Sequence, residues 1–326
     1  MMQPEHTNKF TNLDKPFLIT IQNTKVNPVF ILGHHRSGTS ILYKILIATK
    51  TFNPVTAYHL IYYNQLLYNK EHSLEENAKT DLTNLLKKSQ KDRGIDKLKI
   101  TADFAEEYGF LLGQKTIEMN ISKNNLGRFL EMTKKIQYIS KNKKPLLLKN
   151  PYDFSHFLFI KEKIPNAKFI FIHRHPAKTL SSSIKAIRYL LKEKSLYTTM
   201  LYRLYNTIYA HPPILFFVRL LTNKLSLFGS MVLSLRMSKE VRYYLKNIEK
   251  LSKKDYQEIT YEHLCDKPQE TIETILTSFN LKAQEKIDYN SYIKPRKTTL
   301  DLSVKQLQKF SYAVMKKYYH NFNYQP

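Results

Sequence analysis

Short apolar runs alternate along this chain with segments of helical periodicity. The runs cover residues 28–32, 146–149, 168–173 and 256–261. Runs of this kind are typical of strands that are buried on both faces of a parallel sheet. After each run, apolar residues recur at spacings of three and four, which is the pattern of an amphipathic helix. These spacings predict helices over 39–49, 154–163, 177–191 and 268–279.

The repeated order of strand, turn and helix predicts an α/β fold with a parallel sheet flanked by helices. Ligands of such sheets bind at the carboxyl ends of the strands. Two long segments, 55–140 and 192–250, are mostly helical in pattern, and we expect them to form helical inserts that cap the sheet. A last helix is expected at about 302–319. No linker rich in Pro, Gly or Ser divides the chain, so we expect a single domain over 1–326, with its core motifs at 28–49, 146–191 and 256–281.

The loop after the first predicted strand has the features of an anion site. It reads GHHRSGTS over 33–40, and its two glycines permit a tight turn close to a ligand. The N–H groups at the start of the following helix point into such a loop and favour negative charge. Arg36 adds a planar cation suited to phosphate or sulfate oxygens, and the neighbouring hydroxyls add donors.

This loop differs from the GxxxxGK[ST] motif of nucleoside triphosphatases. No Lys precedes its hydroxyl pair, and the strand over 168–173 ends in His173-Arg174 rather than in a carboxylate that would bind Mg²⁺. We therefore expect arginine and lysine to hold the anion, with no metal.

Four segments together resemble the sulfotransferases that use PAPS (3′-phosphoadenosine-5′-phosphosulfate). GHHRSGTSILYKIL (33–46) is similar to their 5′-phosphosulfate loop, and AKFIFIHRHPAKTLSSSIKA (167–186) to their 3′-phosphate segment. LLLKNP (146–151) and ITYEHLCDKPQETIETILTSFNL (259–281) resemble two further family elements, in the family's order. The resemblance implies a P-loop-type sheet, and transfer of a sulfuryl group from PAPS to a hydroxyl or amine, with PAP (adenosine 3′,5′-bisphosphate) as product.

The resemblance also implies roles for individual residues. Arg174 and Ser182 are expected to hold the 3′-phosphate, and Lys149 is expected near the transferring sulfuryl group. The 5′-phosphosulfate is expected to contact Arg36, Ser37, Gly38, Thr39 and Ser40. Arg36 and Lys149 are the expected catalytic cations. The chain departs from the family at His175, where the family often has Asp.

Attack of an acceptor on sulfur requires a proton acceptor nearby. Relatives place a Glu or His shortly after the first helix, and that region here, 52–64, contains His59 but no carboxylate. His59 is therefore the predicted base, with Glu106 or Glu107 as the alternative. Neighbours on a helix lie about 100° apart, so only one of the two glutamates can point inward. Among the other histidines, His34 or His35 is a weaker candidate donor to the sulfuryl oxygens, and structural roles are expected for His156, His173 and His211.

Composition limits partners and location. The chain has 52 Lys and Arg against 27 Asp and Glu, a formal charge of +25, which favours anionic partners or reflects a lysine-rich solvated surface. Cys265 is the only cysteine, so no intrachain disulfide is expected. The N-terminus has no apolar segment of a signal peptide, and no run of 18 uncharged apolar residues occurs. These features favour a cytoplasmic location and leave a membrane-peripheral one open.

The most apolar stretch is 211–235, HPPILFFVRLLTNKLSLFGSMVLSL. We expect it to form a buried pair of helices. The alternative is a segment that lines a pocket or lies among lipid headgroups, since Arg219, Lys224 and Arg236 interrupt it. That alternative favours an amphiphilic acceptor and peripheral contact with an anionic membrane. The acceptor itself, whether carbohydrate, lipid or small molecule, is not encoded in any motif.

Two other functions remain as alternatives. One is a P-loop nucleotide kinase or phosphotransferase, which the missing GK[ST] and the missing strand-end carboxylate disfavour. The other is a non-catalytic basic protein that binds nucleic acid or a membrane surface. No helix-turn-helix, zinc or RNP pattern is present, so no specific nucleic acid is expected.

Overall fold

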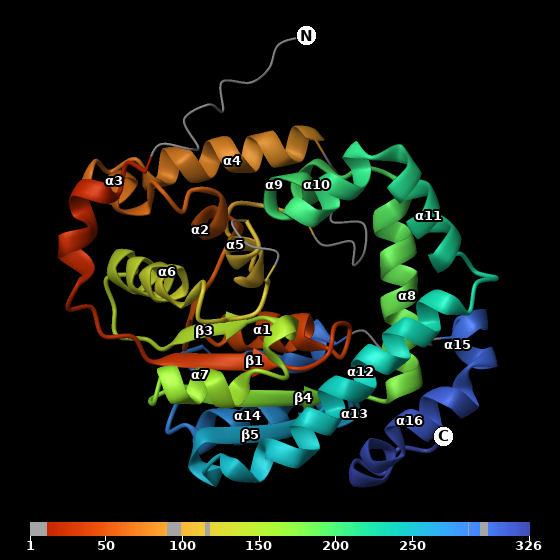
Figure 1. Cartoon of the computed structure of the whole chain (residues 1–326). Coiled ribbons are helices and arrows are strands. Elements are labelled where there is room, and N and C mark those ends of the chain that lie inside the picture. Colours follow the sequence, from red (N-terminus) through yellow and green to blue (C-terminus); the bar gives the residue numbers. More distant parts are fainter. Residues whose placement is uncertain (1–11, 90–98, 115–117, 286, 294–298) are drawn as a thin grey trace.

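A computed structural model of the chain describes residues 12–89, 99–114, 118–285, 287–293 and 299–326. Five parallel strands form one sheet in the order β2-β3-β1-β4-β5, with β1 at its centre (Figure 1). The strands are β1 Pro28–Leu32, β2 Asn53–Pro54, β3 Leu146–Lys149, β4 Lys168–His173 and β5 Tyr256–Thr260. The α/β fold with a parallel sheet is therefore confirmed.

Strand β2 is the element that the apolar pattern did not predict. It has two residues, one of them Pro54, and it pairs only with β3 at the edge of the sheet. A segment this short has no periodicity to detect, and proline is tolerated there because edge strands leave some N–H positions unpaired. The other four strands lie where the apolar runs predict them.

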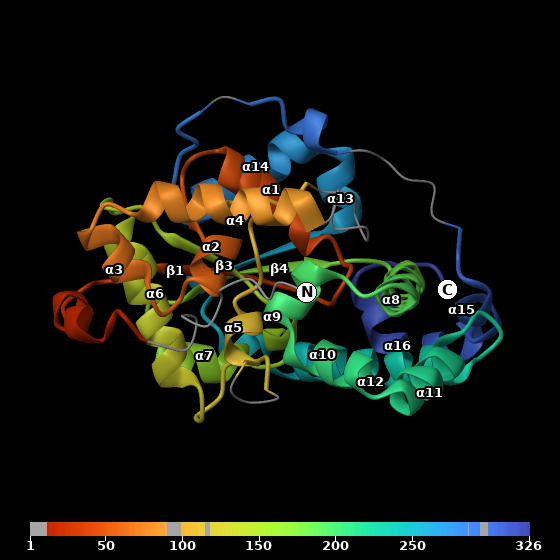
Figure 2. The ribbon, with the colours of Figure 1, turned by 90° about the horizontal axis from the view of Figure 1, so that it is seen from above.

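Alternate residues of the central strand enter two different cores. Val29 and Ile31 pack with helices α1 (Thr39–Ala48) and α14 (Pro268–Ser278). Phe30 and Leu32 pack with α6 (Leu126–Ile139) and α7 (Phe157–Lys163) on the other face. Figure 2 shows α1 and α14 on one side of the sheet and α7 on the opposite side. Both faces are covered, which explains why the strand sequence has no polar alternation.

The two inserts are helical, as predicted. The first contributes α2 Ala57–Ile61, α3 Leu66–Glu71, α4 Glu75–Ser89, α5 Gly109–Leu112 and α6. The second contributes α9 Leu196–Leu201, α10 Arg203–Ala210, α11 Pro212–Thr222 and α12 Phe228–Asn247. Helix α9 packs against α2, so the two inserts meet above the sheet (Figure 1).

Beyond the carboxyl edge of the sheet, α8 (Pro176–Lys192) and α12 pack with the C-terminal helices around a third core. The predicted helix over 302–319 is present as two pieces, α15 Leu302–Gln306 and α16 Gln308–Asn321, which are separated at Leu307.

The expectation that 211–235 forms a buried helix pair is wrong. Helix α11 has no buried residue, and its aromatic side chains are exposed. The part of α12 within this stretch buries only its small residues Gly229, Ser230 and Ser234. Apolarity alone did not reveal this, because a buried apolar helix and an exposed one have the same sequence pattern. Which of the two forms depends on the packing partners. None of the described helices is both long and apolar enough to cross a membrane.

Candidate active site

The loop after β1 has the tight geometry that its glycines predicted. Gly38, which precedes α1, has φ 108°, and Arg36 has φ 68°, both in the left-handed region. A Cβ atom on Gly33 would lie 2.5 Å from the carbonyl oxygen of Ile172 on β4, so only glycine fits there. The loop therefore presents its backbone, and the N-terminus of α1, at the carboxyl edge of the sheet.

The predicted 5′- and 3′-phosphate residues lie against one another. The Nε of Arg36 donates to the Oγ of Ser182 at 3.1 Å, and an Nη of Arg174 donates to the carbonyl of Arg36 at 2.9 Å. The Arg174 guanidinium also lies 4.2 Å from the ring centre of Tyr261. Segments 138 and 146 positions apart in the chain thus form one basic cluster at the strand ends.

Two buried polar atoms in this cluster fit an anionic ligand. Within the described residues, the Nε of Arg174 and the Oγ of Ser37 have no hydrogen-bond partner. Buried donors are normally satisfied, so donors of this kind at a helix N-terminus are suited to phosphate or sulfate oxygens. The residues present therefore fit a donor nucleotide that carries two anionic groups.

The C-terminal segment supports His175, the residue that departs from the family. Its Nε2 lies 2.8 Å from the carbonyl of Gln325, and its backbone N–H donates to Glu262 at 3.3 Å. The hydroxyl of Tyr324 donates to the other oxygen of Glu262 at 3.2 Å. Burial lowers the pKa of His175. The carboxylate near this backbone is Glu262 in the helix after β5, within the YEHL segment, in which no single residue had a predicted role.

Lys149 ends β3 beside the loop, because β3 pairs with β1 in a register that places it opposite Ile31. Its side chain is 1% exposed. Its Nζ donates to the Oγ of Ser40 at 3.1 Å and lies 3.2 Å from an Oε of Glu107. This cation therefore joins the anion loop to a carboxylate of the first insert.

The segment after β3 fixes the position of that carboxylate. Asp153 accepts a hydrogen bond from the hydroxyl of Tyr108 at 2.6 Å and another from the N–H of Ile121 at 2.8 Å. A Cβ on Gly109 would lie 2.6 Å from the side-chain oxygen of Asn150, so the backbone at Gly109 packs closely against that side chain. Sequence analysis missed Asp153 and Tyr108, because a contact over 45 positions leaves no local spacing to detect.

The two glutamates of the first insert have different environments. Glu106 is fully buried: one oxygen accepts from the hydroxyl of Tyr197 at 2.7 Å, and the other accepts from the N–H of Glu107 at 3.0 Å. Glu107 is 8% exposed and lies against Lys149. Of the pair, Glu107 is the one that the structure brings to the predicted catalytic cation.

His59 has a local structural role. Its Nδ1 accepts the N–H of Thr56 at 3.1 Å, which completes a capping box at the start of α2, and its ring also bonds to the carbonyl of Pro54. Burial lowers the pKa of His59 to about 3. Both ring nitrogens are thus engaged with the backbone.

His34 and His35 follow β1 and contact different groups. The Nδ1 of His34 lies 2.7 Å from Glu240 on α12. Burial opposes ionisation of Glu240, but the bonds from His34 and Arg236 lower its pKa to about 2. Burial lowers the pKa of His35 to about 4, and its ring packs edge-on against Tyr152. Of the histidines expected to be structural, His156 bonds to the carbonyl of Tyr152, His173 to the hydroxyl of Tyr318 and His211 to the carbonyl of Thr207.

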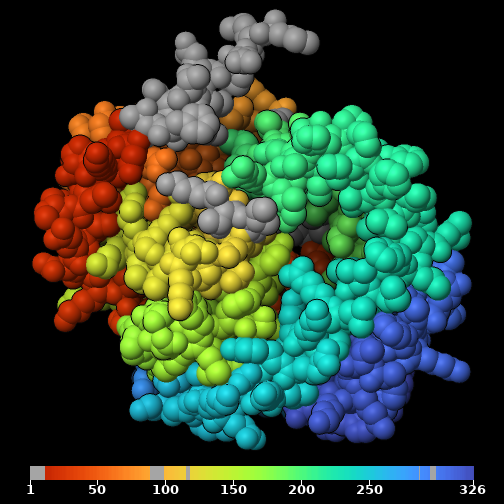
Figure 3. Space-filling model, in the orientation of Figure 1, coloured from red at the N-terminus to blue at the C-terminus, as the bar shows by residue number. Residues whose placement is uncertain are grey.

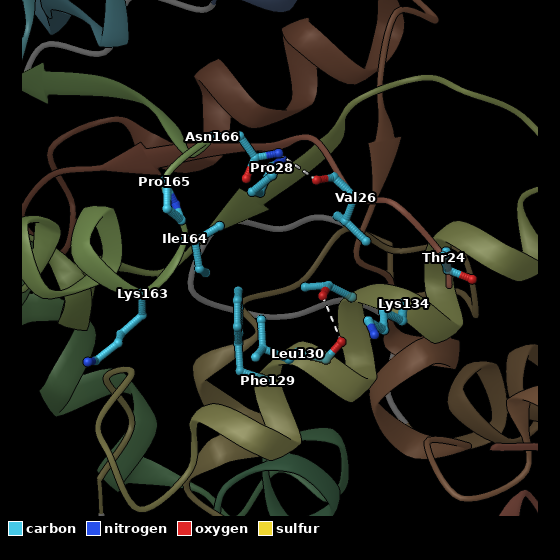
Figure 4. A pocket seen from close by; sticks show the side chains of 11 residues that line it. Thr24, Val26, Pro28, Phe129, Leu130, Lys134, Lys163, Ile164, Pro165 and Asn166 are labelled. Carbon is cyan, nitrogen blue, oxygen red and sulfur yellow. Dashed lines mark hydrogen bonds between the residues drawn. The ribbon is translucent and has the colours of Figure 1, made fainter. Parts of the chain in front are cut away.

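A cavity of about 210 Å³ lies at the other end of the sheet (Figure 4). Pro28 at the start of β1, the turn after α7 and the side of α6 line it. In parallel α/β sheets, ligands bind at the carboxyl ends of strands, and this cavity lies at the amino ends. A second hollow is visible in Figure 3, between the green atoms and the cyan atoms of the second insert. Red atoms of the N-terminal part of the chain are visible at its bottom.

Comparison with known proteins gives one family. Residues 28–216 match the model of the sulfotransferase family. Omega-hydroxy-beta-dihydromenaquinone-9 sulfotransferase Stf3 from Mycobacterium bovis is 28% identical over 181 residues, 48% of this chain and 44% of that protein. The Stf3 protein of Mycobacterium tuberculosis gives the same figures. The match thus spans less than half the length of these curated relatives.

Two solved structures have the same fold. Sulfotransferase STF9 from Mycobacterium avium superposes with a TM-score of 0.62 at 13% identity, over 96% of this chain and 80% of that one. Sulfotransferase STF1 from Mycobacterium tuberculosis gives a TM-score of 0.58 at 13% identity, over 90% of this chain and 78% of that one.

Proposed function

Because this chain belongs to the sulfotransferase family, we propose that it transfers a sulfuryl group from PAPS to a hydroxyl or amine of an acceptor and releases PAP. The observation that carries the proposal is the position of Lys149, which bonds to Ser40 of the anion loop and also to the carboxylate of Glu107. A donor-binding loop, a cation and a proton acceptor therefore adjoin at one sheet edge.

The donor would be held at both of its anionic ends. The N-terminus of α1, with Arg36, Ser37, Gly38, Thr39 and Ser40, would hold the 5′-phosphosulfate. Arg174 and Ser182 would hold the 3′-phosphate. The unsatisfied Nε of Arg174 and Oγ of Ser37 support this assignment.

Transfer would be direct and in line. A bond forms between the acceptor oxygen or nitrogen and sulfur, while the bond from sulfur to the 5′-phosphate oxygen breaks and its electron pair leaves with PAP. Arg36 and Lys149 would stabilise the negative charge that grows on the sulfuryl and leaving oxygens. No covalent intermediate on the protein is needed, and these residues require no metal to balance the charge.

We assign the proton acceptor to Glu107 rather than to His59 or Glu106. Glu107 is next to the proposed catalytic cation, whereas both oxygens of Glu106 accept other hydrogen bonds, from Tyr197 and from the N–H of Glu107. Both ring nitrogens of His59 bond to the backbone. Before reaction, the ion pair with Lys149 would orient the carboxylate. During reaction, Glu107 would take the proton of the attacking hydroxyl or amine.

For the acceptor we favour an amphiphilic alcohol or amine over a free polar sugar. The relatives named above act, by their name, on a hydroxylated menaquinone derivative, which is a lipid-like molecule. The second insert borders the hollow of Figure 3 and exposes apolar residues that would suit an apolar tail. A carbohydrate or a small polar molecule remains the competing class.

One pair of measurements tests the proposal. Calorimetry should detect PAP binding with an affinity in the micromolar range or better, independent of Mg²⁺. Incubation with PAP³⁵S and lipid or sugar extracts should give labelled products that mass spectrometry identifies. Glu107→Gln should bind PAP normally and lose turnover at least about a hundredfold, while Glu106→Gln serves as the matched control. Tight Mg-ATP binding without PAP binding would instead favour a kinase.

A further inference from the structure

Helix α11 exposes its apolar face. Phe216 is 63% exposed and Phe217 is 59% exposed, and no residue of the helix is buried. Large apolar side chains on the surface of a soluble protein are usually scattered singly, and a contiguous group of them marks an interaction site. This helix therefore exposes apolar side chains where an ordinary surface helix carries polar ones.

The exposed residues of α11 share one side of the helix. At 100° per residue, they fall within an arc of about 160°: Pro213, Ile214, Phe216, Phe217, Leu220 and Leu221. The intermediate positions Leu215, Val218 and Thr222 lie on the opposite arc, toward the helices α8, α10 and α12 on which α11 packs. The apolar face thus points away from the protein.

The apolar surface continues into the turn between α11 and α12. Leu225, in the turn between α11 and α12, is 83% exposed, and Phe228 and Val232 on the first turns of α12 are also exposed. We call the surface of α11, residues 223–228 and the first turns of α12 the apolar rim. In Figures 1 and 2 α11 lies at the periphery of the molecule, beyond α8.

Cations accompany the apolar rim. Between Lys192 and Arg236 the chain has six Lys and Arg and one acidic residue, Glu193. Lys224 is exposed beside Leu225, whereas the guanidinium of Arg219 lies on the other side of α11 and donates to the carbonyls of Leu191 and Lys192 at the end of α8. Aromatic and leucine side chains flanked by Lys and Arg have the composition of segments that lie in the headgroup layer of anionic bilayers.

We propose that the apolar rim docks on an anionic lipid bilayer, with Phe216, Phe217 and Leu225 inserted and the cations at the headgroup phosphates. A second copy of the chain fits less well. A two-fold contact would place the same patch on itself, so the cations of one rim would face those of the other. The apolar rim lies on the second insert, which also borders the hollow of Figure 3. A docked protein would therefore present its opening next to lipid-borne acceptors.

Vesicle flotation of the full chain tests this proposal without any reaction. Vesicles of equal parts phosphatidylcholine and phosphatidylglycerol should carry the protein to the top of the gradient, and vesicles of phosphatidylcholine alone should carry much less. The variant Phe216→Ser/Phe217→Ser/Leu225→Ser should lower the partition coefficient at least about tenfold. Ile19→Ser is the matched control, because Ile19 is 65% exposed but lies outside the rim. Lys224→Glu should weaken binding most at low salt.

Three results would overturn the proposal. Wild-type protein could stay at the bottom with anionic vesicles at low salt, or the triple variant could float as the wild type does. Alternatively, sedimentation could show a wild-type dimer that the triple variant dissociates, which would assign the rim to a second copy. PAP calorimetry on each variant reports separately whether the fold and the donor site are intact. Loss of vesicle binding with normal PAP binding therefore leaves the proposed activity standing.

Discussion

The central strand and the apolar rim contain the same kinds of residue and use them in opposite ways. Phe30 on β1 is fully buried among Tyr108, Phe129 and Phe169. Phe216 on α11 is mostly exposed and contacts only the ring of Phe217 among the described aromatic pairs. The same apolar residue therefore stabilises the fold in one region and is available to a partner in the other. The residues packed around the side chain decide which of these two roles it has.

The largest expected difference between the two regions is in stability. Phe30→Ala should lower the free energy of unfolding by about 4 kcal/mol, because it leaves a cavity between two packed faces. Phe216→Ser should change it by less than about 0.5 kcal/mol. Urea denaturation of both variants measures the contrast. A large loss with Phe216→Ser would mean that the rim is part of the core.

A variant at Lys149 tests the proposed chemistry at the carboxyl edge of the sheet rather than the packing of the sheet. Lys149→Ala should lower turnover on the order of a hundredfold, about 3 kcal/mol, because charge that grows in the transition state loses a preorganised cation. The affinity for PAP should fall much less. Lys192→Ala, on an exposed side chain at the end of α8, serves as control. Equal loss of turnover and donor affinity would place Lys149 in ground-state binding only.

Arg174 should distinguish the two anion sites of the donor. Arg174→Ala should weaken PAP about tenfold or more, the usual effect of one lost charged hydrogen bond, and should weaken adenosine 5′-phosphosulfate little, because that compound lacks the 3′-phosphate. Competition calorimetry with both nucleotides measures the ratio. Equal weakening would remove Arg174 from the 3′-phosphate site.

The smallest expected effect concerns His59. His59→Asn should keep turnover within about twofold and cost about 1 kcal/mol of stability, the usual value of a helix cap. The unfolded chain binds a proton near pH 6.5, and the folded chain binds it only near pH 3. Stability from this group is therefore complete above pH 6.5 and falls as the pH falls toward 3. The stability advantage of the wild type over the variant should thus shrink below pH 6.5 and reverse before pH 4. A large loss of turnover in the folded variant would restore His59 as the base.

Features carried by local spacing were readable from the sequence. Four strands, the helices that follow them and the glycine loop before α1 all depend on residues within about ten positions of one another. The pairing of Lys149 with Glu107 depends on a contact across 42 positions, which the position of Asp153 in turn supports. The sequence pointed first to His59 because relatives place a Glu or His shortly after the first helix, and that region here, 52–64, contains no carboxylate. The exposure of 211–235 could not be predicted for a related reason. Whether a side chain is buried depends on which other elements pack against it.

The strand order has a consequence for synthesis. The central strand β1 leaves the ribosome first among the strands, yet its partners β3 and β4 begin only at Leu146 and Lys168. At translation rates of about 5–20 residues per second, both edges of β1 stay unpaired for roughly 6–20 seconds or more. An unpaired apolar strand readily joins another chain. The long first insert, which positions Glu107, thus prolongs the time during which the nascent β1 can pair with another chain.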